Sequence, residues 1–69
     1  MKDPKIGQKV KYVGGLFPEL ELETYTIVQV FGSDSVFGCY VEVMGDLTWK
    51  ILIKSNIDFE LVSSSVSQS

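Results

Sequence analysis

The fold follows from one stretch of sequence, Val36-Phe37-Gly38-Cys39-Tyr40-Val41-Glu42-Val43-Met44-Gly45-Asp46-Leu47-Thr48-Trp49-Lys50-Ile51-Leu52-Ile53. Apolar residues occupy every second position in its first part and again in its second part. A period of two is typical of strands with one buried face, because successive side chains point to opposite sides. We therefore expect a β-hairpin whose inward residues are Phe37, Cys39, Val41, Val43, Leu47, Trp49, Ile51 and Ile53.

The register of this hairpin follows from its two apolar faces, which must lie on the same side of the sheet. A two-residue turn would set Val43 against a polar residue of the second arm. A three-residue loop at 44–46 instead pairs Val43 with Leu47 and Val41 with Trp49. We therefore expect a loop of odd length, or a bulge with the same effect, and a buried Trp49.

Three further segments have the composition of strands, namely 8–13, 24–31 and 59–62. In the first of them Val10 and Tyr12 alternate with lysines, which predicts one face in water. In the second the parity of the apolar residues changes between Ile27 and Val28. A strand that bends sharply, or that serves two sheets, has this pattern.

The connections between the strands differ in length and character. Pro18 argues against a central strand in the long first connection, 14–23, although glutamate and leucine alternate in its second half. We expect a long loop there, whose second half can pair as a hairpin arm with its leucines inward. Residues 32–35 predict a turn, and residues 55–58 predict a single 3₁₀ turn.

Length and composition limit the chain to one small domain. Its 69 residues, 45% of them hydrophobic, suffice for a single core with a thin margin of stability. The Ser-rich residues 63–69 predict a disordered tail, so the domain is expected to span 1–62. The single cysteine, Cys39, excludes an internal disulfide and is expected to be a small buried hydrophobe. No apolar run follows the N-terminal residues, so we expect no signal peptide, no membrane span and a cytoplasmic location.

These elements predict an all-β fold, a five-stranded SH3-like barrel with a long first loop and a short 3₁₀ turn before the last strand. The segments that carry a resemblance are Ile6-Gly7-Gln8-Lys9-Val10-Lys11-Tyr12, Thr24-Tyr25-Thr26-Ile27-Val28, Gly45-Asp46 with Trp49, and Asp58-Phe59-Glu60-Leu61-Val62. With them the chain resembles the small SH3-like proteins of phages, prophages and mobile elements of Gram-positive bacteria. The resemblance implies this fold and an accessory role in a bacterial host cell, and it implies no catalytic residues.

The residue types exclude most catalytic and metal sites. The chain has no histidine, which removes Ser-His and Cys-His nucleophile pairs. One cysteine without histidine also excludes the usual zinc sites. Acid pairs such as Glu42 with Asp46 are expected to be solvated strand residues. We therefore expect neither an enzyme nor a bound cofactor or metal.

The charge distribution favours a protein partner over nucleic acid. The net charge is −3, the chain has no arginine, and no base interrupts the six acids from Glu19 to Asp46. Nucleic-acid binding would use Lys9, Lys11, Lys50 and Lys54 with Tyr12 and Tyr40 nearby. The negative charge and the lack of arginine oppose it. A nucleic-acid-binding accessory domain, and a structural component that self-associates through an edge strand, remain the alternatives.

Two surfaces are candidates for binding a protein, which in a phage context would be a host protein. In the expected register Tyr40 and Lys50 are opposite each other on the outward side of the hairpin. The apolar cluster of Tyr40, Met44 and Leu52 on that side either contacts a partner or is covered by a loop. The second surface is an acidic loop with Phe17 at its tip, which suits a basic partner or is simply solvated. The candidate partner-binding residues are Phe17, Glu19, Glu21, Tyr40, Met44, Lys50 and Leu52.

Overall fold

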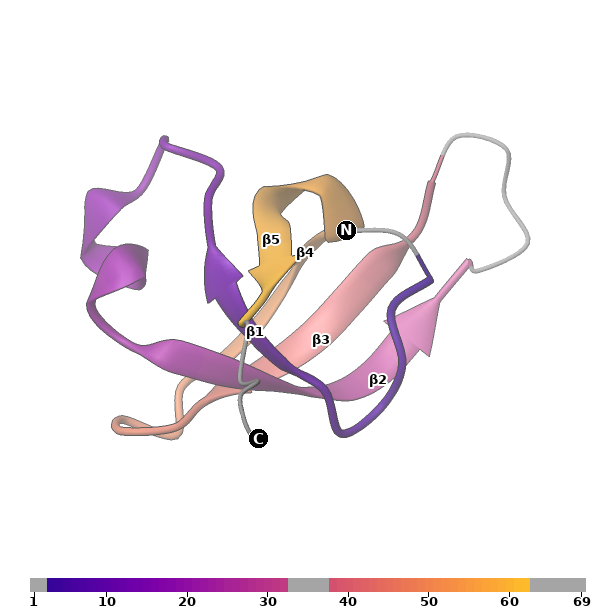
Figure 1. The fold of residues 1–69 in the computed structure, drawn as a ribbon, viewed down its shortest axis with the longest axis horizontal. Coiled ribbons are helices and arrows are strands. Elements are labelled where there is room, and N and C mark those ends of the chain that lie inside the picture. Colours follow the sequence, from indigo (N-terminus) through magenta and orange to yellow (C-terminus); the bar gives the residue numbers. More distant parts are fainter. Residues whose placement is uncertain (1–2, 33–37, 63–69) are drawn as a thin grey trace, which may run out of the picture.

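The computed structural model describes residues 3–32 and 38–62, and it confirms the all-β prediction. Five antiparallel strands form one sheet in the order β4-β3-β2-β1-β5 (Figure 1). The strands are β1 (Lys9–Tyr12), β2 (Thr24–Phe31), β3 (Tyr40–Gly45), β4 (Ile51–Ser55) and β5 (Phe59–Leu61). Two 3₁₀ turns, η1 (Pro18–Leu22) and η2 (Asn56–Asp58), complete the described elements. β4 and β5 end the sheet and do not pair with each other, so the sheet is open.

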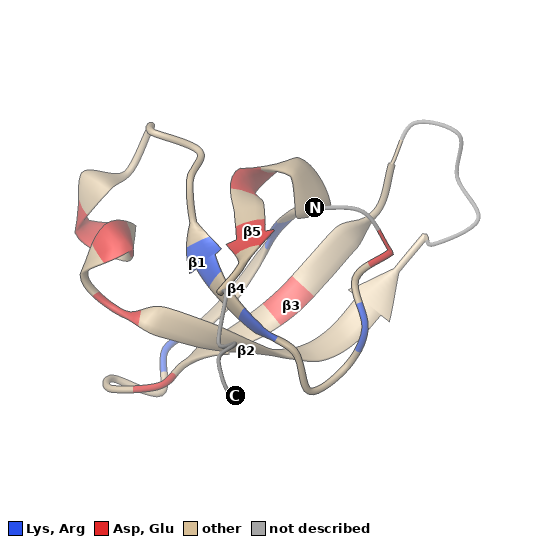
Figure 2. Cartoon of the chain, in the orientation of Figure 1, with Lys and Arg blue, Asp and Glu red and all other residues tan. Residues whose placement is uncertain are grey.

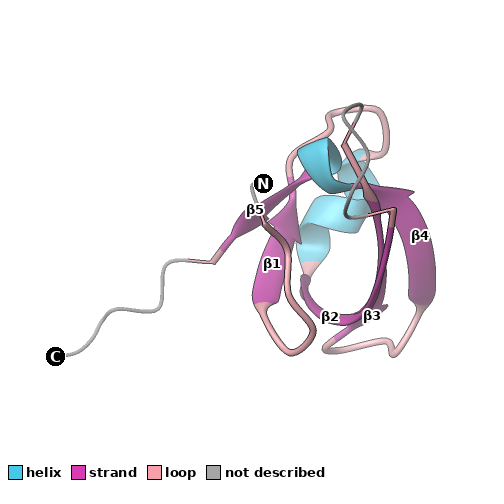
Figure 3. Ribbon diagram, turned by 90° about the vertical axis from the view of Figure 1, so that its right-hand side faces the viewer, coloured by secondary structure: helices cyan, strands magenta, loops and turns pink. Residues whose placement is uncertain are grey.

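The hydrophobic core fills one side of this curled sheet. Its buried residues are Val10, Tyr12, Leu20, Tyr25, Ile27, Val41, Val43 and Phe59. The ring of Phe59 meets the rings of Tyr12 and Tyr25 edge-to-face, with both pairs of centroids 5.9 Å apart, an arrangement that aromatic quadrupoles favour. Seen from the side in Figure 3, the helical turns lie between β1 and β4, where the sheet curls around them.

The predicted change of parity in β2 is confirmed as a shift in its pairing with β3. Ile27 lies opposite Val43, but Gln29 lies opposite Glu42, so Val28 has no counterpart on β3. An extra residue of this kind bends a strand and shifts the alternation by one position, so that residues after it face the side opposite to the one that strict alternation would give them. Val30 can therefore pack against the same core as Ile27.

The predicted register of the β3–β4 hairpin is wrong by five residues. Val43 lies opposite Leu52 instead of Leu47. The connection covers 46–50, and the Gly45 N–H closes it by donating to the carbonyl of Lys50 at 2.8 Å. Because five is an odd number, the inward and outward faces of the second arm are exchanged. Trp49, expected in the core, is 74% exposed.

The same exchange corrects the other inward residues predicted for the second arm. Leu47 belongs to the connection and is 78% exposed, while Ile51 and Ile53 lie on the outer side of β4. Leu52, expected outside, packs against the core. In the first arm the predicted inward positions of Val41, Val43 and the free thiol Cys39 are confirmed by their burial.

The long first connection contains a 3₁₀ turn, η1, and its second half does not pair as a hairpin arm. Pro18 begins η1, a position that requires no N–H donor. Leu20 is buried and its carbonyl accepts the hydroxyl of Tyr25 at 3.0 Å, whereas Leu22 is exposed. The expectation that both leucines point inward is therefore wrong for Leu22.

The predicted 3₁₀ turn before the last strand is confirmed as η2, capped by the Ser55 hydroxyl, which accepts from the Ile57 N–H at 3.4 Å. The predictions for residues 33–35 of the turn, for an inward Phe37 and for a disordered tail at 63–69 lie outside the described residues. Neither helical turn in 3–32 and 38–62 is long and apolar enough to span a membrane.

Candidate functional site

The outward side of β2, β3 and β4 carries exposed apolar side chains. On β3, Tyr40 and Met44 alternate with buried valines and so point away from the core. Tyr40 lies opposite Phe31 of β2, and Met44 lies opposite Ile51 of β4. We call Phe31, Tyr40, Met44, Ile51 and Ile53 the outer face. The exposed fractions of Phe31, Tyr40, Ile51 and Ile53 are 42%, 59%, 51% and 59%.

Polar residues interrupt the middle row of the outer face. Glu42 lies between Gln29 of β2 and Ile53 of β4 in the middle row of the sheet. Met44 is partly covered and has Thr26 on its other side. Single exposed apolar residues are common on protein surfaces, whereas a group of them on three adjacent strands is a candidate contact surface.

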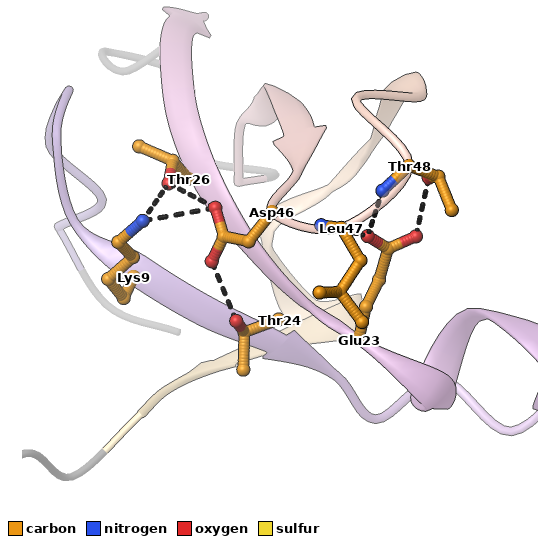
Figure 4. Close-up of polar contacts among 7 residues, drawn as sticks. All are labelled: Lys9, Glu23, Thr24, Thr26, Asp46, Leu47 and Thr48. Atoms are coloured by element: carbon orange, nitrogen blue, oxygen red, sulfur yellow. Dashed lines mark hydrogen bonds and ion pairs between the residues drawn. The ribbon is translucent and has the colours of Figure 1, made fainter.

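The connection from β3 to β4 is fastened by the carboxylate of Glu23, which precedes β2 (Figure 4). Its Oε1 accepts the N–H groups of Leu47 and Thr48 at 2.8 and 3.0 Å, and its Oε2 accepts the Thr48 hydroxyl at 2.7 Å. These donors hold the pKa of Glu23 below its ordinary value of 4.5, with the Thr48 hydroxyl having the largest effect. Glu23 therefore stabilises the connection between β3 and β4 without being part of it.

Asp46 fastens the start of the same connection. Its Oδ2 accepts the Thr24 hydroxyl at 2.6 Å, and its Oδ1 accepts the Thr26 hydroxyl at 2.8 Å and the Lys9 ammonium at 3.0 Å (Figure 4). Its own N–H donates to the Thr24 carbonyl at 2.9 Å. The Thr24 hydroxyl contributes most to a pKa of Asp46 below its ordinary value of 3.8.

The connection held by Glu23 and Asp46 presents Leu47 and Trp49 to solvent in a defined conformation. The Trp49 N–H donates to the Gly45 carbonyl at 3.0 Å, and Trp49 has a φ of 60°. A left-handed backbone at a bulky residue is unfavourable and persists only where its surroundings impose it. Glu23 holds Leu47 and Thr48 just before Trp49 and Asp46 is held to Thr24 and Thr26, so both carboxylates are engaged in hydrogen bonds within the fold.

The structure separates the residues predicted for the first candidate surface. Tyr40 and Met44 are on the outer face. Leu52 lies opposite Val43 and packs against the core, and Lys50 lies in the connection before β4. The expected opposition of Tyr40 and Lys50 is therefore wrong, because Ser55 is the residue across from Tyr40.

The second candidate surface lies on the other side of the sheet. Phe17 precedes η1, and the Lys54 ammonium lies 4.5 Å from the centre of its ring, a cation–π contact. Glu19 and Glu21 are exposed on η1, whose acids are red in Figure 2. Neither glutamate forms an ion pair in the part of the chain that the structure describes. The two predicted surfaces are thus not one site.

Sequence reasoning missed Phe31, Ile51 and Ile53 as surface residues. The parity change in β2 could have revealed Phe31, because Val30 then faces the core and its neighbour must face outward. No local pattern could have revealed the two isoleucines, since their face depends on the register of β4 against β3, and the connection between these strands is held by residues distant in sequence.

Comparison of the chain with protein-family models, with curated proteins and with solved structures found no match. Residues 3–32 and 38–62 contain no group of three or more His, Cys, Asp or Glu side chains that could hold a metal ion.

Proposed function

We propose that this chain is a non-enzymatic interaction module that binds a protein partner through its outer face. The observation that carries the proposal is the gathering of Phe31, Tyr40, Met44, Ile51 and Ile53 on one side of three adjacent strands. Burying such apolar area is the main source of protein–protein affinity, and aromatic residues are enriched at the centres of interfaces. Glu42 in the middle row would fix the orientation of the partner by a polar contact.

The proposal extends to architecture and context. The strand order β4-β3-β2-β1-β5, with a 3₁₀ turn immediately before β5, is compatible with an SH3-like barrel. The proposed setting, an accessory protein of a phage or prophage acting on a host protein in the bacterial cytoplasm, has the sequence resemblance as its support.

Protein is favoured over nucleic acid because two lysines of β1 are already paired. Lys9 forms an ion pair with Asp46 at 3.0 Å, and Lys11 lies 3.7 Å from Glu60. Each pair reduces the positive charge available to phosphate groups in a chain whose net charge is −3.

The test is affinity capture from a lysate of the native host by the immobilised chain, with quantification of each captured protein. Tyr40→Lys places a charge in the outer face and should reduce capture of the partner at least about tenfold, the cost of an unpaired charge at an interface. Ile57→Lys, at an exposed isoleucine of η2, is the control and should capture normally. Equal capture by both variants would refute the outer face, and release of the bound material by nuclease would favour nucleic acid.

The acidic surface on η1 is tested in the same assay. Glu21→Lys reverses one exposed charge beside Glu19. If the partner is basic and uses this surface, capture falls and the loss becomes smaller as salt is raised. Capture equal to that of the unchanged chain would assign Phe17, Glu19 and Glu21 to a solvated turn.

A further inference from the structure

β4 is an edge strand of the sheet, and some of its main-chain N–H and C=O groups point away from the sheet. Two bonds fix which residues direct theirs toward β3: Gly45 N–H to the Lys50 carbonyl at 2.8 Å, and Asn56 N–H to the Cys39 carbonyl at 2.9 Å. Because hydrogen-bonded pairs alternate in an antiparallel ladder, Ile51 and Ile53 direct their N–H and C=O groups away from β3. β4 ends the described sheet, so no strand of the described chain pairs with these groups (Figure 3).

The segment that contains β4 is positively charged, whereas the chain as a whole is negatively charged. Between Leu47 and Ile57 the only charged residues are Lys50 and Lys54, although the whole chain carries −3. Neither lysine forms an ion pair with a described residue, although the Lys54 ammonium lies over the ring of Phe17 and the charge of Lys50 helps to lower the pKa of Glu23. The side chains of Ile51 and Ile53 alternate with these lysines and lie half-exposed on the outer face. β4 is therefore an apolar strand edge flanked by positive charge.

A second copy of this chain is a poor occupant of the edge. If two β4 strands paired antiparallel about Ile53, their Lys54 residues would become diagonal neighbours on one face. No acid between Leu47 and Ile57 would neutralise them. Lysines on edge strands are a common means of preventing pairing between copies. The edge instead complements a strand that brings its own acids.

Resting on the proposed function, we propose that the protein partner adds an extended acidic segment to β4. Main-chain hydrogen bonds to Ile51 and Ile53 supply the pairing, as in other cases of strand addition. Residues of the segment opposite these isoleucines are apolar and continue the outer face. Those opposite Lys50 and Lys54 are aspartate or glutamate. The partner motif is thus acid, apolar, any residue, apolar, acid.

A display library of random nine-residue peptides, selected on the full chain, tests the motif even while the partner is unidentified. We expect enrichment of peptides in which two acidic residues lie four positions apart. The first and third of the three residues between them should be apolar. Enrichment of peptides without this pair of acids would overturn the proposal.

A proline at position 53 tests the main-chain contact itself. Ile53→Pro removes an N–H that points away from β3 and leaves the ladder bonds to β3 in place. It should weaken binding of the selected peptides at least about tenfold, whereas the control Ile53→Val, which keeps the N–H, should bind within about threefold. Undiminished binding by Ile53→Pro would refute strand addition.

Amide hydrogen exchange on the unchanged chain gives an answer that does not depend on how the proline variant folds. The peptide should slow exchange at Ile51 and Ile53 in particular, and no slowing there would refute the proposal. The two proposals also fail separately. Partner capture lost in Tyr40→Lys but normal in Ile53→Pro would reject strand addition alone. Capture lost in Ile53→Pro but normal in Tyr40→Lys and in Ile53→Val would reject the contact at Tyr40 and keep the main chain of β4 as the site.

Discussion

The carboxylate of Glu23 binds Thr48 twice, through its backbone N–H at 3.0 Å and its hydroxyl at 2.7 Å, across 25 residues of chain. A third bond to the Leu47 N–H at 2.8 Å makes Glu23 the acceptor for consecutive backbone donors. The side chain that precedes β2 thereby holds the connection between β3 and β4.

Glu23→Gln should lower the free energy of unfolding, because a neutral amide accepts hydrogen bonds more weakly than a carboxylate and brings its own donors toward three N–H or O–H groups. The measurement is the midpoint of urea unfolding. Glu21→Gln, at an exposed glutamate of η1, is the matched control and should leave the midpoint unchanged. Equal midpoints for the two variants would show that Glu23 does not hold the loop.

Acid should destabilise the fold through Glu23 and Asp46. Both pKa values are lower in the folded chain than their ordinary values of 4.5 and 3.8. A carboxyl with a lowered pKa stabilises the fold fully above its unfolded pKa and loses this contribution as the pH falls through the folded one. The free energy of unfolding should therefore decline below about pH 5. The decline should be shallower in Glu23→Gln and Asp46→Asn, and a slope unchanged in both would contradict the assignment.

The strands were largely predictable because their signals are local. β2 was expected at its observed bounds, and its change of parity at Val28 correctly indicated a bend. The alternation of Val10 and Tyr12 correctly placed both in the core. Each of these inferences needs only the period of two and the side-chain types.

The second arm of the hairpin was not predictable because its apolar alternation is on the exposed side. Leu47, Trp49, Ile51 and Ile53 have the period of a buried face, and local pattern alone pairs them with Val43 and Val41. The observed register is accompanied by hydrogen bonds of Glu23 and Asp46, whose partners lie 20 or more residues away in sequence. Hydrogen bonds between residues so far apart in the sequence leave no periodic pattern of side chains from which they could be predicted. The candidate site failed at Lys50 and Leu52 for the same reason.

Trp49→Gly should make the chain more stable than Trp49→Ala. Both variants remove the exposed indole, but only glycine adopts the φ of 60° at position 49 without a steric penalty. The expected difference in the free energy of unfolding is about 1 kcal/mol in favour of glycine. Chemical denaturation of the two variants measures it, and equal stabilities would mean that the backbone there is not left-handed.

Tyr25→Phe should destabilise the fold by about 1 kcal/mol, the usual net value of a buried hydrogen bond. The Tyr25 hydroxyl donates to the Leu20 carbonyl at 3.0 Å, and burial raises the pKa of this phenol above its ordinary value of 10.0. Tyr40→Phe, at an exposed tyrosine of the outer face, is the control and should change stability by less than about 0.5 kcal/mol. A loss as large in the control would show that removing the hydroxyl has no specific effect on η1.

The register of β3 and β4 can be tested by paired cysteines that share one position. In the structure Glu42 lies opposite Ile53, and the alternation of the ladder makes them a non-hydrogen-bonded pair, in which side chains approach closely. In a Cys39→Ala background, Glu42→Cys with Ile53→Cys should oxidise to an intramolecular disulfide under mild conditions. Glu42→Cys with Thr48→Cys is the pair that local alternation would favour, and it should remain reduced. Mass spectrometry of the oxidised variants distinguishes them. Disulfide formation in the second pair alone would restore the three-residue loop and return Trp49 to the core.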